Sequence, residues 1–410
     1  MSKFDKYFLM EEADILEYVG EKLDFFPEGA QLTCKEIGDG NLNYVFRVQD
    51  AASGTSIIIK HSGEDTRAKS GRKINVDRNR IESEILVRHG ELAGDCVPKV
   101  YTYDPVMCCC VMEDLKDYDV MRKALLEHRA FPFFAEQISS YLADITLATT
   151  DVAMDHKQKK EQVKRYINPD LCSITEQLVY SDSVGNFSGK NYTVPALADF
   201  VQREIYGDKA LRLEAAKLKF DFMNHAQALI HGDLHTGSIF INDRQIKVFD
   251  PEFACYAPIG YDVGNVIAHL LFAMVNAQAV MPQGGEKDAF SGWCLGAVRD
   301  TIDLFAKKFL EKFDQLVTDD MAKTPGFREF YLAGVLSDTA GTAGIELIRR
   351  IVGVAKVADI TGIADEAERA RQEQRLLLIA KRFILNRAEL ASGADYLRVI
   401  GEQFPGLEAK

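Results

Sequence analysis

The chain carries the segment Leu229-Ile-His-Gly-Asp233-Leu-His-Thr-Gly-Ser238-Ile, followed by Val248-Phe-Asp250-Pro-Glu252. The first aspartate lies in a polar turn between two apolar runs, and Asp250 ends a short run with the pattern of a strand. Phosphoryl transfer needs one carboxylate that accepts a hydroxyl proton and another that holds a divalent cation on the nucleotide phosphates. Either aspartate alone would fit a hairpin with surface acids. Their joint spacing instead predicts a helix, a catalytic turn, a hairpin and a metal-binding carboxylate, in that order.

This pattern resembles the catalytic loop of aminoglycoside phosphotransferases, choline kinases and related sugar kinases, where His-Gly-Asp-Leu-His replaces the protein-kinase His-Arg-Asp. The resemblance implies Asp233 as catalytic base and Asp250 as magnesium ligand. It also implies an α+β, bilobal, protein-kinase-like fold. The chain departs from those kinases at Ser238, where they carry a metal-binding asparagine. A serine hydroxyl reaches less far than an amide, so we expect Glu252 to make the second metal contact.

Composition and charge limit the possible partners. The 410 residues, 47% of them hydrophobic, are enough to bury two lobes. A net charge of −13 argues against nucleic-acid binding, which depends on clustered lysine and arginine. The eight cysteines show no zinc-ligand spacing, the N-terminus lacks the apolar core of a signal peptide, and the apolar stretch 266–280 reads as too short and too polar to span a bilayer. We therefore expect a cytoplasmic enzyme without a nucleic-acid or membrane partner.

Hydrophobic periodicity divides the chain near residue 115. Mixed strands with few helices predict a small, β-rich, nucleotide-binding lobe over residues 1–115. Helical periodicity dominates afterwards, including residues 213–228, and predicts a larger, mainly helical, catalytic and substrate-binding lobe over residues 116–410. Residues 180–192, rich in serine, glycine and asparagine, read as a surface loop, and residues 281–288 read as another.

A glycine-rich hairpin and a strand-end lysine predict the nucleotide site. Gly38 and Gly40 allow close approach of backbone amides to phosphates, although a hairpin alone would also explain them. Asn43 stands where protein kinases have a third glycine, and its amide could donate to a phosphate or hold the loop. The strand that follows ends at Lys60, which we expect to bind phosphate rather than solvent.

The helix after this strand offers two acidic partners for Lys60. Resemblance favours Glu82, but the sequence alone leaves Glu84 open, and a surface ion pair would explain either. The segment Glu113-Asp114-Leu115 is predicted as the hinge between lobes, whose backbone would bind the adenine edge. ATP and Mg²⁺ are the expected cofactors.

Three longer stretches carry a closer resemblance. They are Gly38-Asp-Gly-Asn-Leu-Asn-Tyr-Val-Phe, the catalytic segment with Gly260-Tyr-Asp-Val-Gly-Asn, and Ile348-Arg349-Arg350-Ile-Val-Gly. Together they resemble the S-methyl-5-thioribose kinase family of methionine salvage over nearly the whole chain. This resemblance implies transfer of the ATP γ-phosphoryl group to the anomeric hydroxyl of the thiosugar. It also implies a homodimer, with residues 266–280 as either dimer surface or core.

The late arginine pair is expected to bind the sugar. Arg349 and Arg350 map onto the arginine pair by which that family engages its sugar. Adjacent residues of a helix point about 100° apart, so we expect at most one of the two to face a given ligand. A solvated basic patch at a helix end is the alternative. Asp262 is expected to hold the amides of the catalytic turn, and His231 and His235 to orient groups around the base.

Two other functions remain compatible with the sequence. The chain could be another small-molecule hydroxyl kinase of the same fold, acting on choline, homoserine or an aminoglycoside. It could also be a nucleotide-binding pseudokinase scaffold. The scaffold hypothesis predicts damage to the catalytic set, yet Lys60, Asp233 and Asp250 are all present.

Overall fold

The computed structural model describes all residues except 1, 38–42 and 64–72. Unit 1, one of two compact units, comprises Met1–Tyr118 and Lys247–Ala254. Unit 2 comprises Asp119–Ile246 and Cys255–Lys410. The boundaries 1–115 and 116–410 remain a prediction about domains, because compactness alone does not show that either part folds independently. The sequence pattern gave no indication that the segment around Asp250 returns to unit 1.

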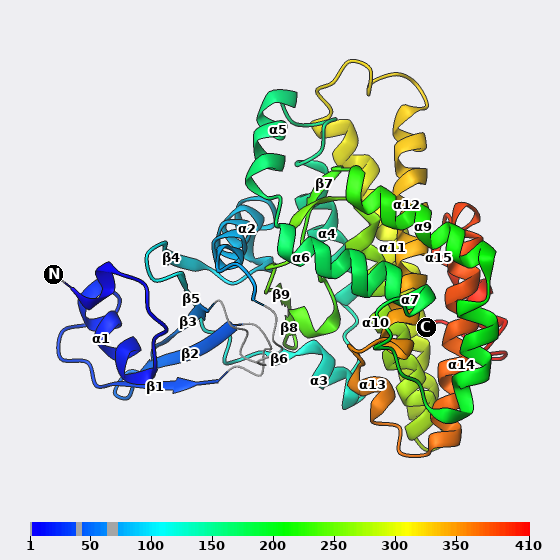
Figure 1. The fold of residues 1–410 in the computed structure, drawn as a ribbon, viewed down its shortest axis with the longest axis horizontal. Coiled ribbons are helices and arrows are strands. Elements are labelled where there is room, and N and C mark those ends of the chain that lie inside the picture. The colour runs from blue at the N-terminus through cyan, green and yellow to red at the C-terminus, as the bar shows by residue number, and fades with distance from the viewer. Residues whose placement is uncertain (1, 38–42, 64–72) are drawn as a thin grey trace. The chain divides into compact units, whose positions relative to one another are not determined.

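Unit 1 is built on one antiparallel sheet of five strands in the order β1-β2-β3-β5-β4 (Figure 1). Two longer helices accompany it. These elements are β1 (Leu32–Glu36), β2 (Asn43–Asp50), β3 (Ser56–Ser62), β4 (Val100–Asp104), β5 (Cys109–Glu113), α1 (Glu12–Lys22) and α2 (Asp77–Ala93).

The alternation of side chains along β3 fixes the direction of Lys60. Ile57 and Ile59 are fully buried in a core cluster that includes Ile15 and Val19 of α1. Successive side chains of a strand point to opposite faces, so Lys60 points away from that core. There it meets α2, whose Asn79 donates from Nδ2 to the Lys60 carbonyl at 3.1 Å.

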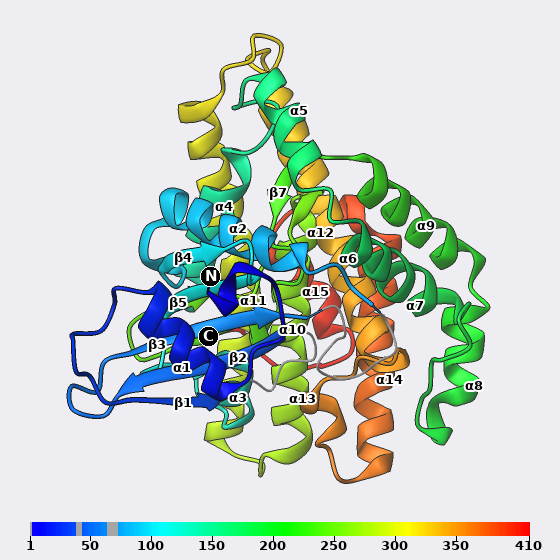
Figure 2. The same ribbon diagram turned by 60° about the vertical axis from the view of Figure 1, so that its left-hand side comes forward.

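Unit 2 is mainly helical, and its centre is formed by α10, α12 and α14, which lie side by side in both ribbon views (Figures 1 and 2). The helix α11 packs against α10 and α4. The helices are α3 (Met121–Leu126), α4 (Phe134–Leu147), α5 (His156–Arg165), α6 (Pro169–Ile174), α7 (Asp182–Gly185), α8 (Ala198–Val201), α9 (Lys209–Asn224), α10 (Gly260–Val280), α11 (Gly285–Leu316), α12 (Phe327–Val352), α13 (Ala358–Thr361), α14 (Glu366–Leu385) and α15 (Gly393–Gly401).

Five short strands accompany the predicted catalytic turn in the sequence. They are β6 (Asp119–Val120), β7 (Ala228–Ile230), β8 (Ile239–Ile241), β9 (Ile246–Val248) and β10 (Cys255–Ala257). The expected helix directly before the turn is wrong, because α9 ends at Asn224 and β7 pairs antiparallel with β10. The β-rich unit 1 and the helical unit 2 confirm the expected α+β class.

Both predicted surface loops are wrong in part. Residues Thr175–Ser181 form a π-helix that runs into α7, and Tyr180 and Val184 are almost fully buried. Serine and asparagine favour turns through local hydrogen bonds, but the apolar residues between them pack into the unit and override that preference. The second predicted loop already enters α11 at Gly285.

The apolar segment 266–280 belongs to a longer helix than the sequence pattern indicated. Among the described residues, α10 is the one helix long and apolar enough to cross a membrane, because it begins at Gly260, six residues before the stretch considered in the sequence. However, 83% of its apolar window is buried inside the protein. Of the two interpretations of this segment, core and dimer surface, the structure supports the core.

Gly264 allows α10 and α12 to pack closely. A methyl group on Gly264 would lie 2.6 Å from the Thr339 carbonyl oxygen and 2.7 Å from the Ala343 amide nitrogen. Both are backbone atoms of α12, which cannot move without shifting the helix. By contrast, Gly334, also on α12, has nothing within 4 Å of such a methyl.

We expect Gly264→Ala to lower the free energy of unfolding by about 1–3 kcal/mol, because the added methyl overpacks the α10–α12 contact. Gly334→Ala is the matched control, and we expect it to raise stability by about 0.5–1 kcal/mol through helix propensity alone. Urea unfolding monitored by circular dichroism measures both. Equal effects of the two substitutions would contradict the packing argument.

Candidate active site

Lys60 lies among carboxylates in unit 1. Its ammonium contacts both oxygens of Glu82, at 2.8 and 2.7 Å, and also pairs with Asp250. Of the two candidate partners on α2, Glu82 is therefore the one that pairs with Lys60, while Glu84 pairs with Arg80 at 2.9 Å. Burial alone would lower the pKa of Lys60, but Asp250 and Glu82 outweigh it and raise this pKa, so the lysine stays charged.

The acidic side chains near Lys60 form a possible cation site. Oxygens of Glu82, Asp250 and Glu252 all lie within 4.8 Å of one another. Burial, with the charge of Asp250, raises the pKa of Glu252, and burial likewise raises that of Glu82. The raised pKa values show that the nearby cations do not fully compensate these carboxylates. Closely spaced carboxylate oxygens of this kind are ligands that Mg²⁺ prefers. The residues present thus fit the metal expected from the sequence.

Backbone strain marks Asp250 as a special position. Its φ of 66° lies in the left-handed region, which costs free energy for any residue with a Cβ. Such strain is common where a side chain must be aimed at a ligand. The sequence pattern gave no indication of it.

The remaining predicted nucleotide-binding residues of unit 1 differ in their surroundings. Asn43 is buried, donates from Nδ2 to Glu252 Oε2 at 2.7 Å and accepts from Ser62 Oγ at 2.6 Å. Two roles were expected for Asn43, donation to a phosphate or support of the loop. Its contacts with Glu252 and Ser62 are those of a supporting residue. Gly38 and Gly40 lie outside the described residues.

The acidic side chains of the predicted hinge form ion pairs within unit 1. Asp114 accepts two hydrogen bonds from Arg47, at 2.7 and 2.8 Å. Glu113 accepts from Lys247 at 2.9 Å, and its own amide donates to the Lys99 carbonyl at 2.8 Å. Leu115 is buried. The Glu113 amide is thus already used within the sheet, which leaves the neighbouring backbone groups as candidates for adenine binding.

In unit 2, the turn that carries Asp233 is fixed by a buried carboxylate. Asp262, at the start of α10, accepts from the amides of His231 at 2.6 Å and Gly232 at 3.0 Å, which confirms the expected scaffold role. Gly232 has a φ of 83°, a conformation that glycine adopts without strain. Ser238 donates from Oγ to the Asp233 carbonyl at 3.0 Å, so its hydroxyl is used to close the turn.

Both arginines of the late pair lie near the predicted base. Arg349 and Arg350 place a guanidinium nitrogen 3.8 and 3.9 Å from Asp233 Oδ1. Both side chains thus reach the same carboxylate, although adjacent residues of a helix point about 100° apart. Their long side chains converge because Glu346, three and four residues earlier on α12, contacts the Nε atoms of both, at 3.0 and 2.6 Å.

Glu346 and His269 were not predicted as site residues from the sequence. Glu346 is fully buried and also contacts His269 Nε2 at 3.0 Å. Burial would raise the pKa of Glu346, but the two arginines hold it well below its usual value, so the carboxylate stays charged. A helical spacing of three and four residues between an acid and two arginines was the signal that could have identified it.

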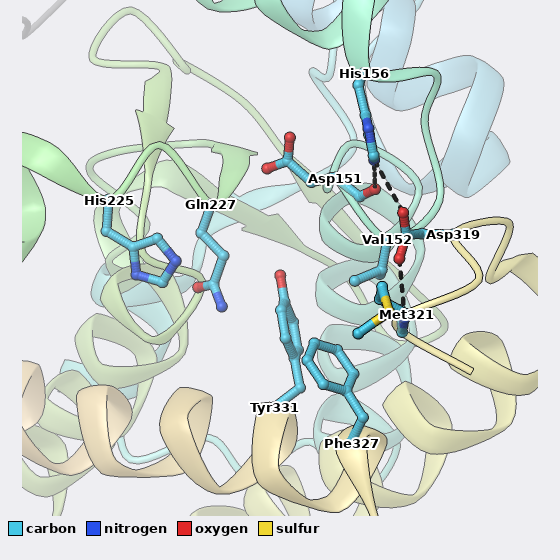
Figure 3. A pocket seen from close by; sticks show the side chains of 10 residues that line it. Asp151, Val152, His156, His225, Gln227, Asp319, Met321, Phe327 and Tyr331 are labelled. Carbon is cyan, nitrogen blue, oxygen red and sulfur yellow. Dashed lines mark hydrogen bonds and ion pairs between the residues drawn. The ribbon is translucent and has the colours of Figure 1, made fainter. Parts of the chain in front are cut away.

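A cavity of about 290 Å³ lies elsewhere in unit 2 (Figure 3). Tyr331 points into it, with Gln227 on one side and Asp319 on the other (Figure 3). None of the predicted site residues lines this cavity. It is therefore not the nucleotide or acceptor site indicated by the sequence.

His225, which lines this cavity, also belongs to a group of three titratable side chains with Asp221 and Asp338. Burial and the charge of Asp221 raise the pKa of Asp338 to about 7, although Arg387 lies 3.2 Å away. A hydrogen bond with Asp221 raises the pKa of His225. Both native-state pKa values exceed the ordinary values of 3.8 and 6.5.

These shifts predict a pH-dependent stability. A group with a raised native pKa stabilises the fold below its unfolded pKa, and the stabilisation is lost as the pH rises through the native value. We expect the contribution of Asp338 and His225 to the free energy of unfolding to fall as the pH rises from about 4 to 7. In denaturant unfolding across this range, the difference in free energy of unfolding between the unchanged protein and Asp338→Asn should therefore shift toward the variant as the pH rises. An unchanged slope in that variant would show that Asp338 does not bind a proton in the native state.

Asp250→Asn tests the cation site. A ligand present at 100 times its dissociation constant raises the free energy of unfolding by about 2.7 kcal/mol. We expect Mg²⁺ with an ATP analogue to stabilise the unchanged protein by this amount and Asp250→Asn much less, because one of the three carboxylates is neutralised. Asp243→Asn is the matched control, since the side chain of Asp243 is 94% exposed. Equal stabilisation of both variants would show that Asp250 does not bind the cation.

Comparisons with known proteins agree with this geometry. Residues 33–284 match the APH phosphotransferase enzyme family. The chain is 38% identical over 372 residues to a methylthioribose kinase from Geobacillus sp. (strain WCH70), covering 90% of each chain. It is 35% identical over 395 residues to a methylthioribose kinase from Yersinia enterocolitica, covering 96% of this chain and 98% of the other.

A solved structure shows the same fold. The choline kinase from Cryptosporidium parvum Iowa II matches with a TM-score of 0.52 at 12% identity, covering 94% of this chain and all of that one. At this identity the match concerns the fold alone. The match to the phosphotransferase family and the near full-length relatives show that the chain is a kinase-type enzyme and belongs to the methylthioribose kinase family.

Proposed function

We propose that this protein transfers the γ-phosphoryl group of ATP to the anomeric hydroxyl of S-methyl-5-thio-D-ribose, giving the 1-phosphate in methionine salvage. The proposal is supported by the near full-length relatives named methylthioribose kinase. The observation that carries it is the pair of guanidinium groups within 4 Å of the Asp233 carboxylate. These groups suit a neutral acceptor rich in hydroxyl oxygens, because guanidinium N–H groups donate to such oxygens.

In this proposal, Asp233 accepts the proton of the acceptor hydroxyl. Arg349 and Arg350 bind the sugar, and the Glu346 carboxylate holds both in place. The side chain of Asp233 is about one quarter exposed, which allows a substrate to reach it. Proton transfer by a positioned carboxylate contributes about 10²–10⁴-fold to the rate of such reactions.

The nucleotide is assigned to the residues of unit 1. Lys60, oriented by Glu82, binds phosphate oxygens, together with the backbone at Gly38 and Gly40. Asp250 and Glu252 hold Mg²⁺, which shields the negative charge of the phosphates when it is bound. Asn43 supports Glu252, and the hinge backbone at 113–115 binds adenine.

The alternative acceptors differ in charge. Choline carries a fixed positive charge and aminoglycosides carry several, and the Arg349 and Arg350 cations would repel both. Homoserine offers a carboxylate that these arginines could bind, so it is the stronger competitor. A pseudokinase scaffold is disfavoured because Lys60, Asp233 and Asp250 are all present.

We also propose that the enzyme is a cytoplasmic homodimer without a nucleic-acid or membrane partner. The dimer follows from the family resemblance, and the charge of −13 supports the absence of nucleic-acid binding. All eight cysteines are free thiols, as expected in a reducing compartment. Light scattering of the purified protein measures the number of subunits.

An ADP-release assay tests the acceptor. We expect turnover with methylthioribose and little with choline, homoserine or an aminoglycoside at equal concentration. Asp233→Asn should lower kcat by about 10²–10⁴-fold, because the base is lost, while Mg²⁺-ATP still binds. Turnover restricted to another acceptor would refute the proposed substrate. An Asp233→Asn variant with unchanged kcat would refute its role as the base.

A further inference from the structure

His235 lies two residues after Asp233 and has one ring nitrogen surrounded by donors. Nδ1 is 3.0 Å from the amide nitrogen of Gly237 and 3.1 Å from Nη2 of Arg122. A backbone amide and a guanidinium carry protons but no free lone pair on nitrogen. Ser238 Oγ, 3.3 Å from Nδ1, gives its own proton to the Asp233 carbonyl. Because the two nearer neighbours of Nδ1 can only donate, Nδ1 is the unprotonated acceptor, and the proton of the neutral ring is on Nε2.

The protonated nitrogen faces the predicted base. Nε2 of His235 lies 3.5 Å from Asp233 Oδ2, while Arg349 and Arg350 lie near the other oxygen, Oδ1. This distance is longer than an ordinary hydrogen bond, and catalytic hydrogen bonds often shorten when substrate is bound. The two carboxylate oxygens thus face different groups, a neutral N–H and a pair of cations.

His235 stays neutral in these surroundings. A proton on Nδ1 would face the N–H groups of Gly237 and Arg122, and the ring is largely buried. Burial, followed by the charges of Arg122 and Arg350, holds the pKa of His235 well below its usual value. An uncharged donor can orient Asp233 without reducing its basicity as a cation would.

Gly237 makes room for Arg122 to reach His235. A methyl group on Gly237 would lie 2.7 Å from Arg122 Nη2 and 2.7 Å from His235 Cε1. Arg122 comes from α3, more than 100 residues earlier in the chain, and its buried Nε has no hydrogen-bond partner among the described residues. The guanidinium of Arg122 thus contacts Nδ1 of His235 through Nη2, while its Nε makes no hydrogen bond.

We propose that Arg122 and His235 form a positioning pair, in which Arg122, together with the Gly237 amide, fixes the tautomer of His235 and His235 orients the carboxylate of Asp233. Neither residue exchanges a proton with the substrate. The pair holds Oδ2, which leaves Oδ1 to face the acceptor on the side of Arg349 and Arg350. This proposal rests on the role proposed above for Asp233.

Kinetics with the best acceptor of the ADP-release panel test the pair. We expect His235→Leu to lower kcat by about 100-fold, because the base is misoriented, with both KM values within about twofold. His235→Gln should recover most of this loss, because its amide nitrogen reaches about as far as Nε2. Since both residues act through one contact, Arg122→Leu should add less than about twofold in the His235→Leu background.

Nitrogen NMR of protein with ¹⁵N-labelled histidine tests the tautomer without any substrate. We expect His235, assigned from its absence in His235→Gln, to show a protonated Nε2 and an unprotonated Nδ1. Arg122→Leu should raise the share of the tautomer with a protonated Nδ1, because only the Gly237 amide then remains as a donor-only neighbour of Nδ1. Lys123→Leu, an exposed position on the same helix, is the control and should leave the spectrum unchanged.

The two experiments separate this proposal from the acceptor assignment. A wrong acceptor changes which sugar is turned over but leaves the histidine spectrum as expected. A protonated Nδ1 would overturn the pair. So would a folded His235→Leu variant whose kcat is within about twofold of the unchanged enzyme, a His235→Gln variant as slow as His235→Leu, or losses that multiply in the double variant.

Discussion

The carboxylate of Asp262 is the constraint on which the geometry of unit 2 depends. It is fully buried and accepts from two consecutive backbone amides of the turn that presents Asp233. Burial raises the pKa of Asp262, and the two amide donors oppose that shift. Because Asp262 lies on the core helix α10, the position of the turn is tied to the packing of that helix. The close contact of Gly264 with α12 brings the helix of Glu346, Arg349 and Arg350 against the same core.

Opposite charge surpluses distinguish the two units. Around Lys60, three buried or half-buried carboxylates exceed the nearby positive charge, which suits a divalent cation. Around Asp233, the guanidinium groups of Arg349, Arg350 and Arg122 outnumber the carboxylates of Asp233 and Glu346, which suits an uncharged or anionic acceptor. Placing these surpluses in different units assigns cation and nucleotide binding to one and acceptor binding to the other.

Much of this arrangement could be predicted from residue order. The strand that carries Lys60, the pairing of this lysine with an acid on the next helix and the scaffold role of Asp262 all depend on local spacing, although the strand continues to Ser62. The arginine pair was expected near the acceptor. That both guanidinium groups reach Asp233 depends on Glu346 and on the length of the arginine side chains, which a helical projection does not represent. Tyr180 was misplaced in a loop because its burial is decided by tertiary packing, which overrides local turn preferences. The contact of Arg122 with His235 joins residues 113 positions apart, and single-sequence patterns carry no information about it.

The central claim is that Asp233, beside Arg349 and Arg350, activates the anomeric hydroxyl of a thiosugar toward ATP. Phosphorus NMR of the product formed from ATP, Mg²⁺ and methylthioribose tests it most directly, because proton–phosphorus correlation identifies the phosphorylated carbon. The account predicts one new phosphomonoester whose phosphorus correlates with the anomeric proton. A phosphomonoester that correlates with any other sugar proton, or release of inorganic phosphate alone, would contradict it.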